Sequence, residues 1–334
     1  MRYFLTGATG FIGGVLARQL IERGHQVVAV VRSPDKAGDL KALGVEIHAG
    51  DVTDKETMRA PMTGVDGVFH VAGWYKIGVP DTSPGQAINV EGTRNVLTLM
   101  RELGIAKGVY TSTLAVNGDT HGQEVDESYH AGAPFLSEYD RTKWEAHVQV
   151  AEPMIQEGLP LVIVMPGLVY GPGDTSNVRT TLIQFLERKL PMLPAKTAYS
   201  WGHVEDIAAA HILAMEKGVP GEHYIIAGET MTLVDAMHLA SRLTGVPAPR
   251  IVLPPFFFKA SSRIVGLIER MVSMPSTYTA EGLRVLAGVT YIGSNAKARK
   301  ELGYDPRPLE VGLKATLEHE QALLKATPKP AGKA

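Results

Sequence analysis

The chain contains no cysteine. This absence excludes disulfide bonds, catalysis by a thiolate and iron–sulfur clusters held by cysteine, and nothing points to an oxidising compartment. No apolar run approaches the ~20 residues that a membrane-spanning helix needs. Neither sign of charge is in excess, since 33 basic residues face 35 acidic ones. The composition therefore indicates neither a nucleic-acid partner nor an acidic membrane partner.

Signals for targeting and for metal binding are also lacking. A strand-like segment begins almost at residue 1, which leaves no room for a signal peptide, so we expect a cytoplasmic protein. Residues 327–334 have few groups to bury, and we expect a disordered tail there. The 11 histidines show no metal-ligand spacing such as His-Glu-x-x-His, so we predict no metal.

The most informative segment that is present is the glycine-rich stretch Thr6–Gly13. It follows a short apolar strand, Tyr3–Leu5, and opens a helical pattern. A strand, a glycine-rich turn and a helix N-terminus make an anion site, because backbone N–H groups and the positive helix end point at a phosphate. Gly7 would allow the tight turn, Gly10 would let a pyrophosphate approach, and Gly13 would let helix pack on strand.

Strand and helix signals alternate through the first half of the chain. The expected strands are Tyr3–Leu5, Val27–Val31, Val45–His48, Gly67–Ala72, Gly108–Ser112 and Leu161–Met165, with helices between them, notably Asn89–Leu103 and Ser137–Gln156. Pro153 is expected to kink the second of these helices or to end it early. Such alternation predicts an α/β fold with a doubly wound, parallel Rossmann sheet.

The regular alternation is lost near Gly171, and this suggests two domains. We assign residues 1–168 to a dinucleotide-binding domain, to which a strand at His223–Ala227 returns. We assign residues 169–326 to a smaller, mainly helical lobe that binds the substrate.

A second constellation points to proton transfer. Tyr139 and Lys143 are four residues apart on a predicted helix, so both face the same way. This helix follows a strand that ends in Thr111-Ser112-Thr113, and ligands of open α/β sheets bind at the carboxyl ends of strands. A phenol must lose its proton easily to act near neutral pH, and a nearby lysine cation favours the phenolate.

With these motifs the sequence resembles the extended short-chain dehydrogenase/reductase family, within the group of dihydroflavonol-reductase-like proteins and NAD(P)-dependent epimerases and dehydratases. The resemblance covers residues 2–320 approximately. The matching segments are Thr6–Gly13, Asp51-Val52, His70–Gly73, Asn89–Thr93, Tyr139–Lys143, Gly171–Asp174, His203–Asp206 and Glu301–Tyr304.

The resemblance implies a hydride-transfer site. Tyr139 would be the general acid in reduction or the base in oxidation. Lys143 would bind the nicotinamide ribose and lower the pKa of Tyr139. Thr113 would orient the substrate oxygen, with Ser112 in its place if the register differs by one. The residues expected to bind the cofactor are Gly7, Thr9, Gly10, Phe11, Ile12, Gly13, Arg32, Lys36, Asp51, Val52, Val71, Ala72, Gly73, Tyr139, Lys143 and Pro166.

Arg32 bears on the choice of cofactor. It directly follows a predicted strand, at the position where NAD enzymes typically place an acidic residue. An arginine accommodates a 2′-phosphate instead, and Lys36 lies just beyond. The pattern favours NADP(H), with NAD(H) as the alternative.

Three functions remain open, and the first is favoured. It is NADP(H)-dependent reduction of a ketone or aldehyde in a fairly hydrophobic small molecule. The second is an NAD(P)-dependent sugar epimerase, and the third is a non-catalytic dinucleotide-binding regulator. Members of the family that act on nucleotide sugars usually carry a phosphate-binding arginine where this chain has Tyr199. The residues expected to contact the substrate are Trp74, Tyr75, Thr113 and Tyr170.

The family resemblance also suggests a homodimer. Relatives of this fold often pair through two helices per subunit, here Asn89–Leu103 and Ser137–Gln156. The second helix carries more apolar surface than its own sheet needs, in Val148, Val150, Ala151, Met154 and Ile155. A symmetric contact would bury this surface.

Overall fold

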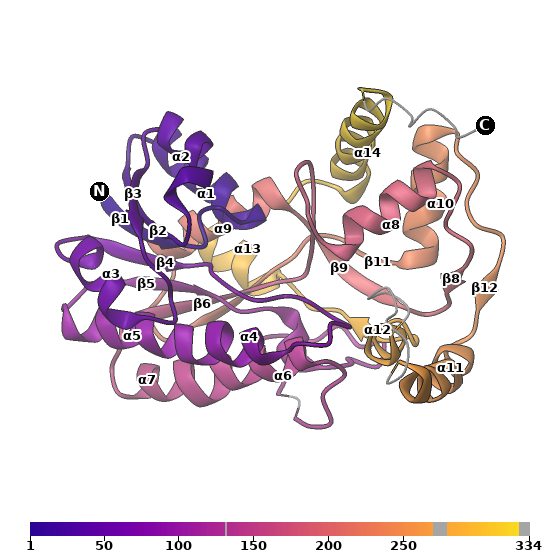
Figure 1. Ribbon diagram of the computed structural model, residues 1–334, viewed down its shortest axis with the longest axis horizontal. Coiled ribbons are helices and arrows are strands. Elements are labelled where there is room, and N and C mark those ends of the chain that lie inside the picture. The colour runs from indigo at the N-terminus through magenta and orange to yellow at the C-terminus, as the bar shows by residue number, and fades with distance from the viewer. Residues whose placement is uncertain (131, 270–278, 327–334) are drawn as a thin grey trace.

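Seven parallel strands form the main sheet (Figure 1). The computed structural model describes residues 1–130, 132–269 and 279–326, so the predicted tail at 327–334 lies outside the described residues. The strands are β1 (Arg2–Thr6), β2 (Gln26–Val31), β3 (Glu46–Ala49), β4 (Gly67–His70), β5 (Gly108–Thr111), β6 (Leu161–Pro166) and β10 (His223–Ile226). Their order is β10-β6-β5-β4-β1-β2-β3, which confirms the doubly wound sheet and the returning strand. The winding direction reverses between β1 and β4, where such sheets bind their ligands.

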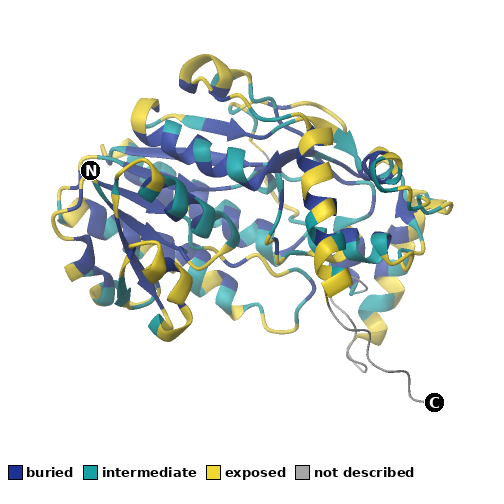
Figure 2. Ribbon diagram, turned by 90° about the horizontal axis from the view of Figure 1, so that it is seen from above, coloured by how far each residue is buried: buried dark blue, intermediate teal, exposed yellow. Residues whose placement is uncertain are grey.

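Helices cover both faces of this sheet, and Figure 2 shows the strands buried between them. One face carries α1 (Phe11–Glu22), α2 (Gly38–Ala42), α9 (Val204–Lys217) and α13 (Ala296–Leu302). The other carries α3 (Lys55–Met62), α5 (Gly92–Glu102) and the helix that runs from Glu138 to Gln156. Because both faces are covered, the strands are continuous apolar runs such as Val27–Val31.

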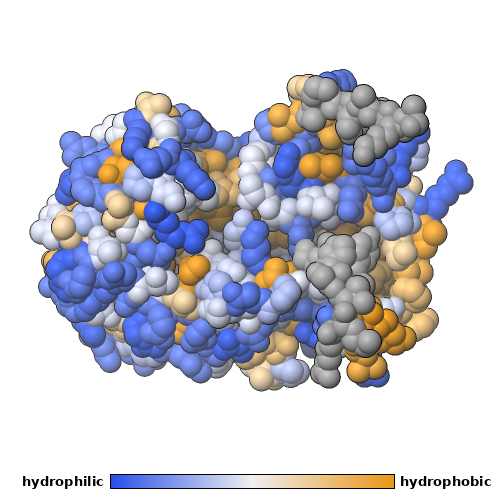
Figure 3. All heavy atoms as spheres, viewed as in Figure 1, coloured by the Kyte–Doolittle hydropathy of each residue, from blue (hydrophilic) through white to orange (hydrophobic). Residues whose placement is uncertain are grey.

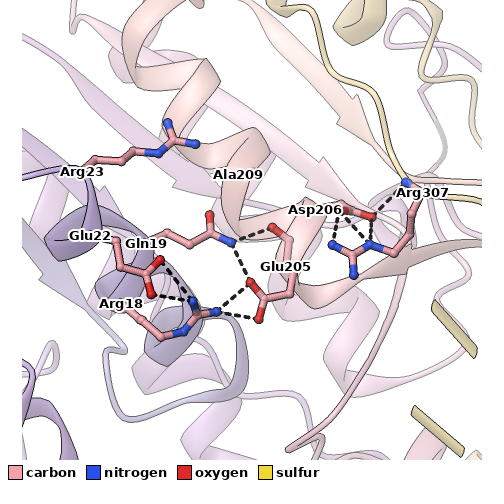
Figure 4. A pocket seen from close by; sticks show the side chains of 8 residues that line it. All are labelled: Arg18, Gln19, Glu22, Arg23, Glu205, Asp206, Ala209 and Arg307. Carbon is pink, nitrogen blue, oxygen red and sulfur yellow. Dashed lines mark hydrogen bonds and ion pairs between the residues drawn. The ribbon is translucent and has the colours of Figure 1, made fainter. Parts of the chain in front are cut away.

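The first turn of α9 is fixed by charged contacts (Figure 4). The Arg18 guanidinium on α1 donates to both carboxylate oxygens of Glu205 at 2.6 and 2.7 Å, and the Gln19 amide donates to Glu205 at 2.9 Å. Arg307 holds the neighbouring Asp206 with hydrogen bonds of 2.7 to 3.0 Å. Glu205 and Asp206 belong to one of the signature segments, and here they attach α9 to α1 and to the chain before the last helix.

The helix predicted at 137–156 runs its full length, so Pro153 does not end it early. It consists of α6 (Glu138–Trp144), a wider π-helical segment η4 (Glu145–Ala151) and α7 (Glu152–Gln156). Pro153 falls in the first turn of α7, directly after the π-helical segment, where a missing N–H is tolerated. The helix predicted at 89–103 begins earlier than expected, because α4 (Ser83–Gly85) and the π-helical η2 (Gln86–Glu91) precede α5.

The second lobe begins at Leu168 and contains a small sheet as well as helices (Figure 1). Its strands are β7 (Leu168–Tyr170), β9 (Ala198–His203), β11 (Thr230–Thr232) and β13 (Thr290–Tyr291), with a separate pair β8 (Leu193–Pro194) and β12 (Val252–Leu253). Its helices are α8 (Asn177–Leu186), α10 (Leu233–Thr244), α11 (Pro255–Ile268), α12 (Ala280–Val285) and α14 (Leu309–Ala326). Helices α9 and α13 pack on the first domain, so more of the chain returns there than we expected. Among the described residues, no helix has the length and apolar character to cross a membrane.

The apolar residues from which we expected a dimer are used inside the subunit. Val150, Ala151 and Met154 are buried in the same apolar cluster as α5 and strands β5 and β6. Ile155 packs against that cluster, and Val148 is only partly exposed. The inference of surplus apolar surface was therefore wrong, because α5 as well as the sheet covers this helix. The homodimer itself stays a prediction.

Candidate functional site

The loop between β1 and α1 has the geometry of a phosphate-binding turn. Gly7 has a φ of +74°, and a Cβ there would lie 2.7 Å from the backbone nitrogen of Ala72. Gly13 packs so closely on the loop that a Cβ would collide with the carbonyl group of Gly7. Gly10 is the N-cap of α1 and has no side chain to bond the first helical N–H groups. Those groups are therefore available to an anion.

The residues expected around the adenosine follow strands β2 and β3. Arg32 is the first residue after β2 and is exposed, and no hydrogen bond or ion pair of its guanidinium is found within the described part of the chain. Lys36 is also exposed, at the end of a short 3-10 turn, η1 (Pro34–Lys36). Asp51 accepts hydrogen bonds from the backbone and hydroxyl of Thr53, both at 2.9 Å, and Val52 is buried beside it.

The other residues expected to bind the cofactor lie at the carboxyl ends of strands or at the start of α1. They are Thr9, Phe11, Ile12, Val71, Ala72, Gly73 and Pro166. All except Pro166 lie next to β1 and β4, between which the strand order reverses, and Pro166 ends β6 two strands from β4.

A buried asparagine joins the segment after β4 to α6. The Asn89 side chain is 1% exposed; its Oδ1 accepts from the Trp74 N–H at 2.7 Å, and its Nδ2 donates to the Trp74 carbonyl at 2.9 Å. The same Nδ2 donates to the hydroxyl of Thr142 at 2.9 Å, between Tyr139 and Lys143 on α6. Sequence reasoning matched Asn89 only as part of a motif. The structure shows that it holds α6 beside the segment after β4.

Tyr139 and Thr113 lie next to each other at the carboxyl end of β5, and the Thr113 side chain lowers the pKa of the Tyr139 phenol. Thr113 is the N-cap of the short turn η3 (Leu114–Asn117), and Tyr139 lies in the first turn of α6. The neighbouring Ser112 hydroxyl is instead 2.7 Å from Nδ1 of His147. The register that pairs Thr113 with Tyr139 is therefore the one seen in the structure.

Burial sets the protonation of the two titratable groups. It raises the pKa of Tyr139 to about 12, although the Thr113 side chain acts in the opposite direction. Burial also lowers the pKa of Lys143 to about 7. The Lys143 ammonium donates to the carbonyl of Thr111 at 2.7 Å. Lys143 is not among the groups that shift the pKa of Tyr139 in this structure, so the expected lowering is not found here.

A chain of buried polar groups links Lys143 to the glycine loop. The Lys143 ammonium donates to the Tyr110 hydroxyl at 3.3 Å, and Tyr110 is hydrogen-bonded to Thr93. The Thr93 hydroxyl is 2.9 Å from Nε2 of His70, and Nδ1 of His70 is 2.8 Å from the hydroxyl of Thr6. Burial lowers the pKa of His70 to about 3, so its neutral ring donates one hydrogen bond and accepts the other. No local sequence pattern indicates this row of polar groups, since its members come from five separate elements: β1, β4, α5, β5 and α6.

Asp140 is a buried carboxyl group beside Tyr139 that sequence reasoning also missed. It is 2% exposed and accepts a hydrogen bond from the Tyr291 hydroxyl at 3.1 Å. Burial raises its pKa from 3.8 to about 7, so the folded state favours the protonated form.

This shift predicts a pH-dependent stability. A carboxyl group with a raised pKa contributes stability that is fully present below about pH 4 and is lost as the pH rises to about 7. We expect Asp140→Asn to remove most of this loss, on the order of a few kcal/mol, and to be more stable than the wild type at pH 8. Urea unfolding between pH 4 and 8 measures the difference. Asp39→Asn, an exposed control, should follow the wild type, and parallel curves for all three proteins would contradict the prediction.

The aromatic residues expected to contact the substrate lie in different environments. Tyr75 is 45% exposed, and its hydroxyl is 3.0 Å from that of Thr175, so it bridges the two lobes. Trp74 is buried against Gly85. Tyr170 is 1% exposed and packs edge-on against Trp201 and His203 in the core of the second lobe. The expectation of a substrate contact was therefore wrong for Tyr170.

One carboxylate of the second lobe contacts the start of the helix that carries Tyr139. Glu281, on α12, accepts from the backbone N–H of Glu138 at 2.6 Å and from that of Gly78 at 2.5 Å. It therefore caps the N-terminus of the helix that carries Tyr139. Nearby, α11 leaves Phe256 and Phe257 exposed, and Figure 3 shows apolar surface over this helix at the lower right.

The comparisons with known proteins agree with this geometry. The chain matches the NAD dependent epimerase/dehydratase family over residues 3–227. It is 34% identical over 315 residues to a protein of Synechocystis sp. that is named as a dihydroflavonol 4-reductase, covering 90% of this chain and 89% of that protein. It is 32% identical over 334 residues to a 2-alkyl-3-oxoalkanoate reductase of Stenotrophomonas maltophilia, covering 94% and 98%.

A solved structure gives the same result. The one titled "Crystal structure of gox2253" superposes with a TM-score of 0.85 at 31% identity and covers 96% of this chain and 98% of that one. The chain belongs to the NAD dependent epimerase/dehydratase family. It is therefore an NAD(P)-dependent enzyme, of the oxidoreductase or epimerase type that this family contains.

Proposed function

We propose that the protein is an NADP(H)-dependent reductase of a ketone or aldehyde in a fairly hydrophobic small molecule. The observation that carries the proposal is the neighbouring pair Thr113 and Tyr139, which lies beside Lys143 at the carboxyl end of β5. The Asn89 bridge holds this pair next to the segment after β4, which in turn lies against Gly7. The proposed roles are a proton donor for Tyr139, orientation of the substrate oxygen for Thr113 and ribose binding for Lys143.

The protonation of Tyr139 supports the reductive direction. With a pKa of about 12, the phenol keeps its proton near pH 7 and can donate it to an oxygen that is gaining negative charge. The nicotinamide cofactor, when bound, supplies the hydride. The two relatives above whose names give an activity are both named as reductases, and one name specifies a 3-oxo compound.

The residue at position 199 argues against a nucleotide-sugar substrate. Tyr199, at the position where relatives that act on nucleotide sugars carry an arginine, stacks on Tyr291 with ring centroids 6.1 Å apart. An aromatic pair offers no charge to hold a pyrophosphate. A sugar epimerase therefore remains the second candidate, favoured by the family membership and by a relative of Streptomyces lividans, 27% identical, that is named as a UDP-glucose 4-epimerase.

Turnover of the cofactor separates the two candidates. We would incubate the enzyme with NADPH and a panel of aromatic and aliphatic carbonyl compounds, including 2-alkyl-3-oxoalkanoates, and follow the NADPH absorbance. A reductase consumes free NADPH with at least one of these compounds. An epimerase recycles its bound cofactor, so isomerisation of a sugar without a net change in absorbance would overturn the proposal.

The preference for NADP(H) rests on Arg32, which has no acidic partner among the residues that the structure describes. A charge-assisted hydrogen bond to the 2′-phosphate contributes about 1.5–3 kcal/mol. We expect Arg32→Ala to weaken NADPH binding by at least about tenfold and to leave NADH binding nearly unchanged. Fluorescence titration with both cofactors measures this. Equal or tighter binding of NADH by the wild type would refute the preference.

A further inference from the structure

Three side chains of the kinds that bind metal ions lie together where the helix that carries Tyr139 meets the edge strand of the main sheet. His147 comes from η4, Glu152 from the first turn of α7 and His223 from β10. One potential ligand atom from each residue lies within 4.8 Å of the other two. Nε2 of His147 is 3.4 Å from a carboxylate oxygen of Glu152, and the rings of His147 and His223 are 4.9 Å apart.

A contact at Nδ1 fixes the orientation of the His147 imidazole. Its Nδ1 is 2.7 Å from the Ser112 hydroxyl, so Nε2 is the nitrogen that faces Glu152. Histidines that bind metals almost always have such a partner on the other ring nitrogen, because it fixes the ring and the tautomer.

A cavity of roughly 190 Å³ adjoins the three residues and is also lined by Asn117, Glu127 and His130. Asn117 is 3% exposed, and its side-chain nitrogen has no hydrogen-bond partner among the described residues. A buried N–H without an acceptor is rare in folded proteins, so its presence indicates a polar ligand in this cavity.

We propose that His147, Glu152 and His223 bind a divalent transition metal ion of the zinc type, with a water molecule in the adjoining cavity as a further ligand. Two imidazole nitrogens and one carboxylate are a donor set that Zn²⁺ uses, whereas Mg²⁺ and Ca²⁺ prefer oxygen ligands throughout. Ligands about 2.0–2.1 Å from a tetrahedral ion lie about 3.4 Å apart, which is the spacing of His147 and Glu152. The ligand atom of His223 lies within 4.8 Å of those of His147 and Glu152, so it would have to move closer to bind the same ion. The bound water then accepts a hydrogen bond from Asn117.

The contact between Nε2 of His147 and the carboxylate of Glu152 allows two interpretations, and the first is a shared metal ion. The alternative is a hydrogen-bonded His–Glu pair with no ion, and the experiment below separates the two.

The place of the site gives it a consequence for the catalytic residues. His147 lies one helical turn after Lys143, and Ser112 directly precedes Thr113. An ion at this point would join the helix that carries Tyr139 and Lys143 to the edge strand β10. The sequence could not show the site, because its ligands are 5 and 71 residues apart along the chain (152 − 147 and 223 − 152). The inference does not depend on the proposed reaction.

The test measures binding of Zn²⁺ to the full-length protein after treatment with a chelator. We expect isothermal titration calorimetry to show one Zn²⁺ per chain and the melting temperature to rise when Zn²⁺ is added. His223→Gln and Glu152→Gln should weaken binding by more than about 100-fold, and Ser112→Ala by about 10- to 100-fold. Co²⁺ in place of Zn²⁺ should give the visible absorption of a tetrahedral site in the wild type alone. Circular dichroism confirms that each variant is folded.

His238→Gln removes an exposed histidine on α10 and is the matched control, which should bind Zn²⁺ like the wild type. The proposal is overturned if the wild type binds no Zn²⁺ in the titration. It is also overturned if folded His223→Gln binds Zn²⁺ as tightly as the wild type, because the ion is then held elsewhere on the surface.

Discussion

Replacing Tyr139 by phenylalanine is expected to lower turnover by about 10²- to 10⁴-fold, the usual contribution of a general acid. The substitution removes only the hydroxyl, and the ring still fills its partly buried place in α6. Because the hydroxyl acts in the proton-transfer step, kcat should fall while the dissociation constant of NADPH stays close to that of the wild type. Steady-state kinetics and a fluorescence titration measure the two quantities. Activity close to that of the wild type would refute the proposed mechanism.

The partner of Tyr139 provides an internal comparison. The Thr113 side chain lies next to the Tyr139 phenol. The Ser112 hydroxyl is instead within hydrogen-bond distance of the His147 ring. Thr113→Ala should therefore impair turnover much more than Ser112→Ala does. If Ser112→Ala is the worse of the two, the hydroxyl that serves the substrate has been assigned to the wrong residue.

The sequence predicts the main sheet well because each signal is local. A run such as Val27–Val31 must be buried on both faces wherever it lies, and Thr6–Gly13 contains the turn and the helix start within eight residues. The short strands of the second lobe, such as Thr290–Tyr291, have no comparable periodicity. Their pairing with β9 depends on contacts between distant segments, which no local pattern encodes.

The candidate site was predictable only where one segment contains the chemistry. Tyr139 and Lys143 share a helix, so their spacing alone brings them together. Asp140 was not recognised, because its raised pKa depends on burial beside Tyr291, over 100 residues later in the sequence. Tyr170 was expected to contact the substrate because it follows β6 closely. In the structure its side chain is buried in the apolar core of the second lobe. Sequence patterns thus located the backbone of the site, while tertiary packing decided the environment of each side chain.

Gly13→Ala is expected to damage both cofactor binding and stability. The new Cβ would lie against the Gly7 carbonyl group, with the carbonyl carbon at 2.7 Å and the Cα of Ala8 at 3.1 Å. These are backbone atoms that cannot rotate away, so α1 must move off the loop. Overpacking of this kind costs about 1–3 kcal/mol. Because the Gly7 carbonyl accepts the hydrogen bond from Gly10 that closes the turn, the phosphate-binding geometry changes with it. We expect NADPH affinity to fall by more than about tenfold.

The adjacent Gly14 is the matched control. It lies on the same helix, but a Cβ there would meet only the Ala8 carbonyl oxygen at 3.4 Å, an ordinary contact. Alanine is favoured over glycine inside a helix by about 0.5–1 kcal/mol, so Gly14→Ala should bind NADPH normally and be at least as stable as the wild type. Urea unfolding and NADPH titration of the two variants decide the matter. Equal behaviour of Gly13→Ala and Gly14→Ala would mean that close packing of α1 on the loop does not shape the cofactor site.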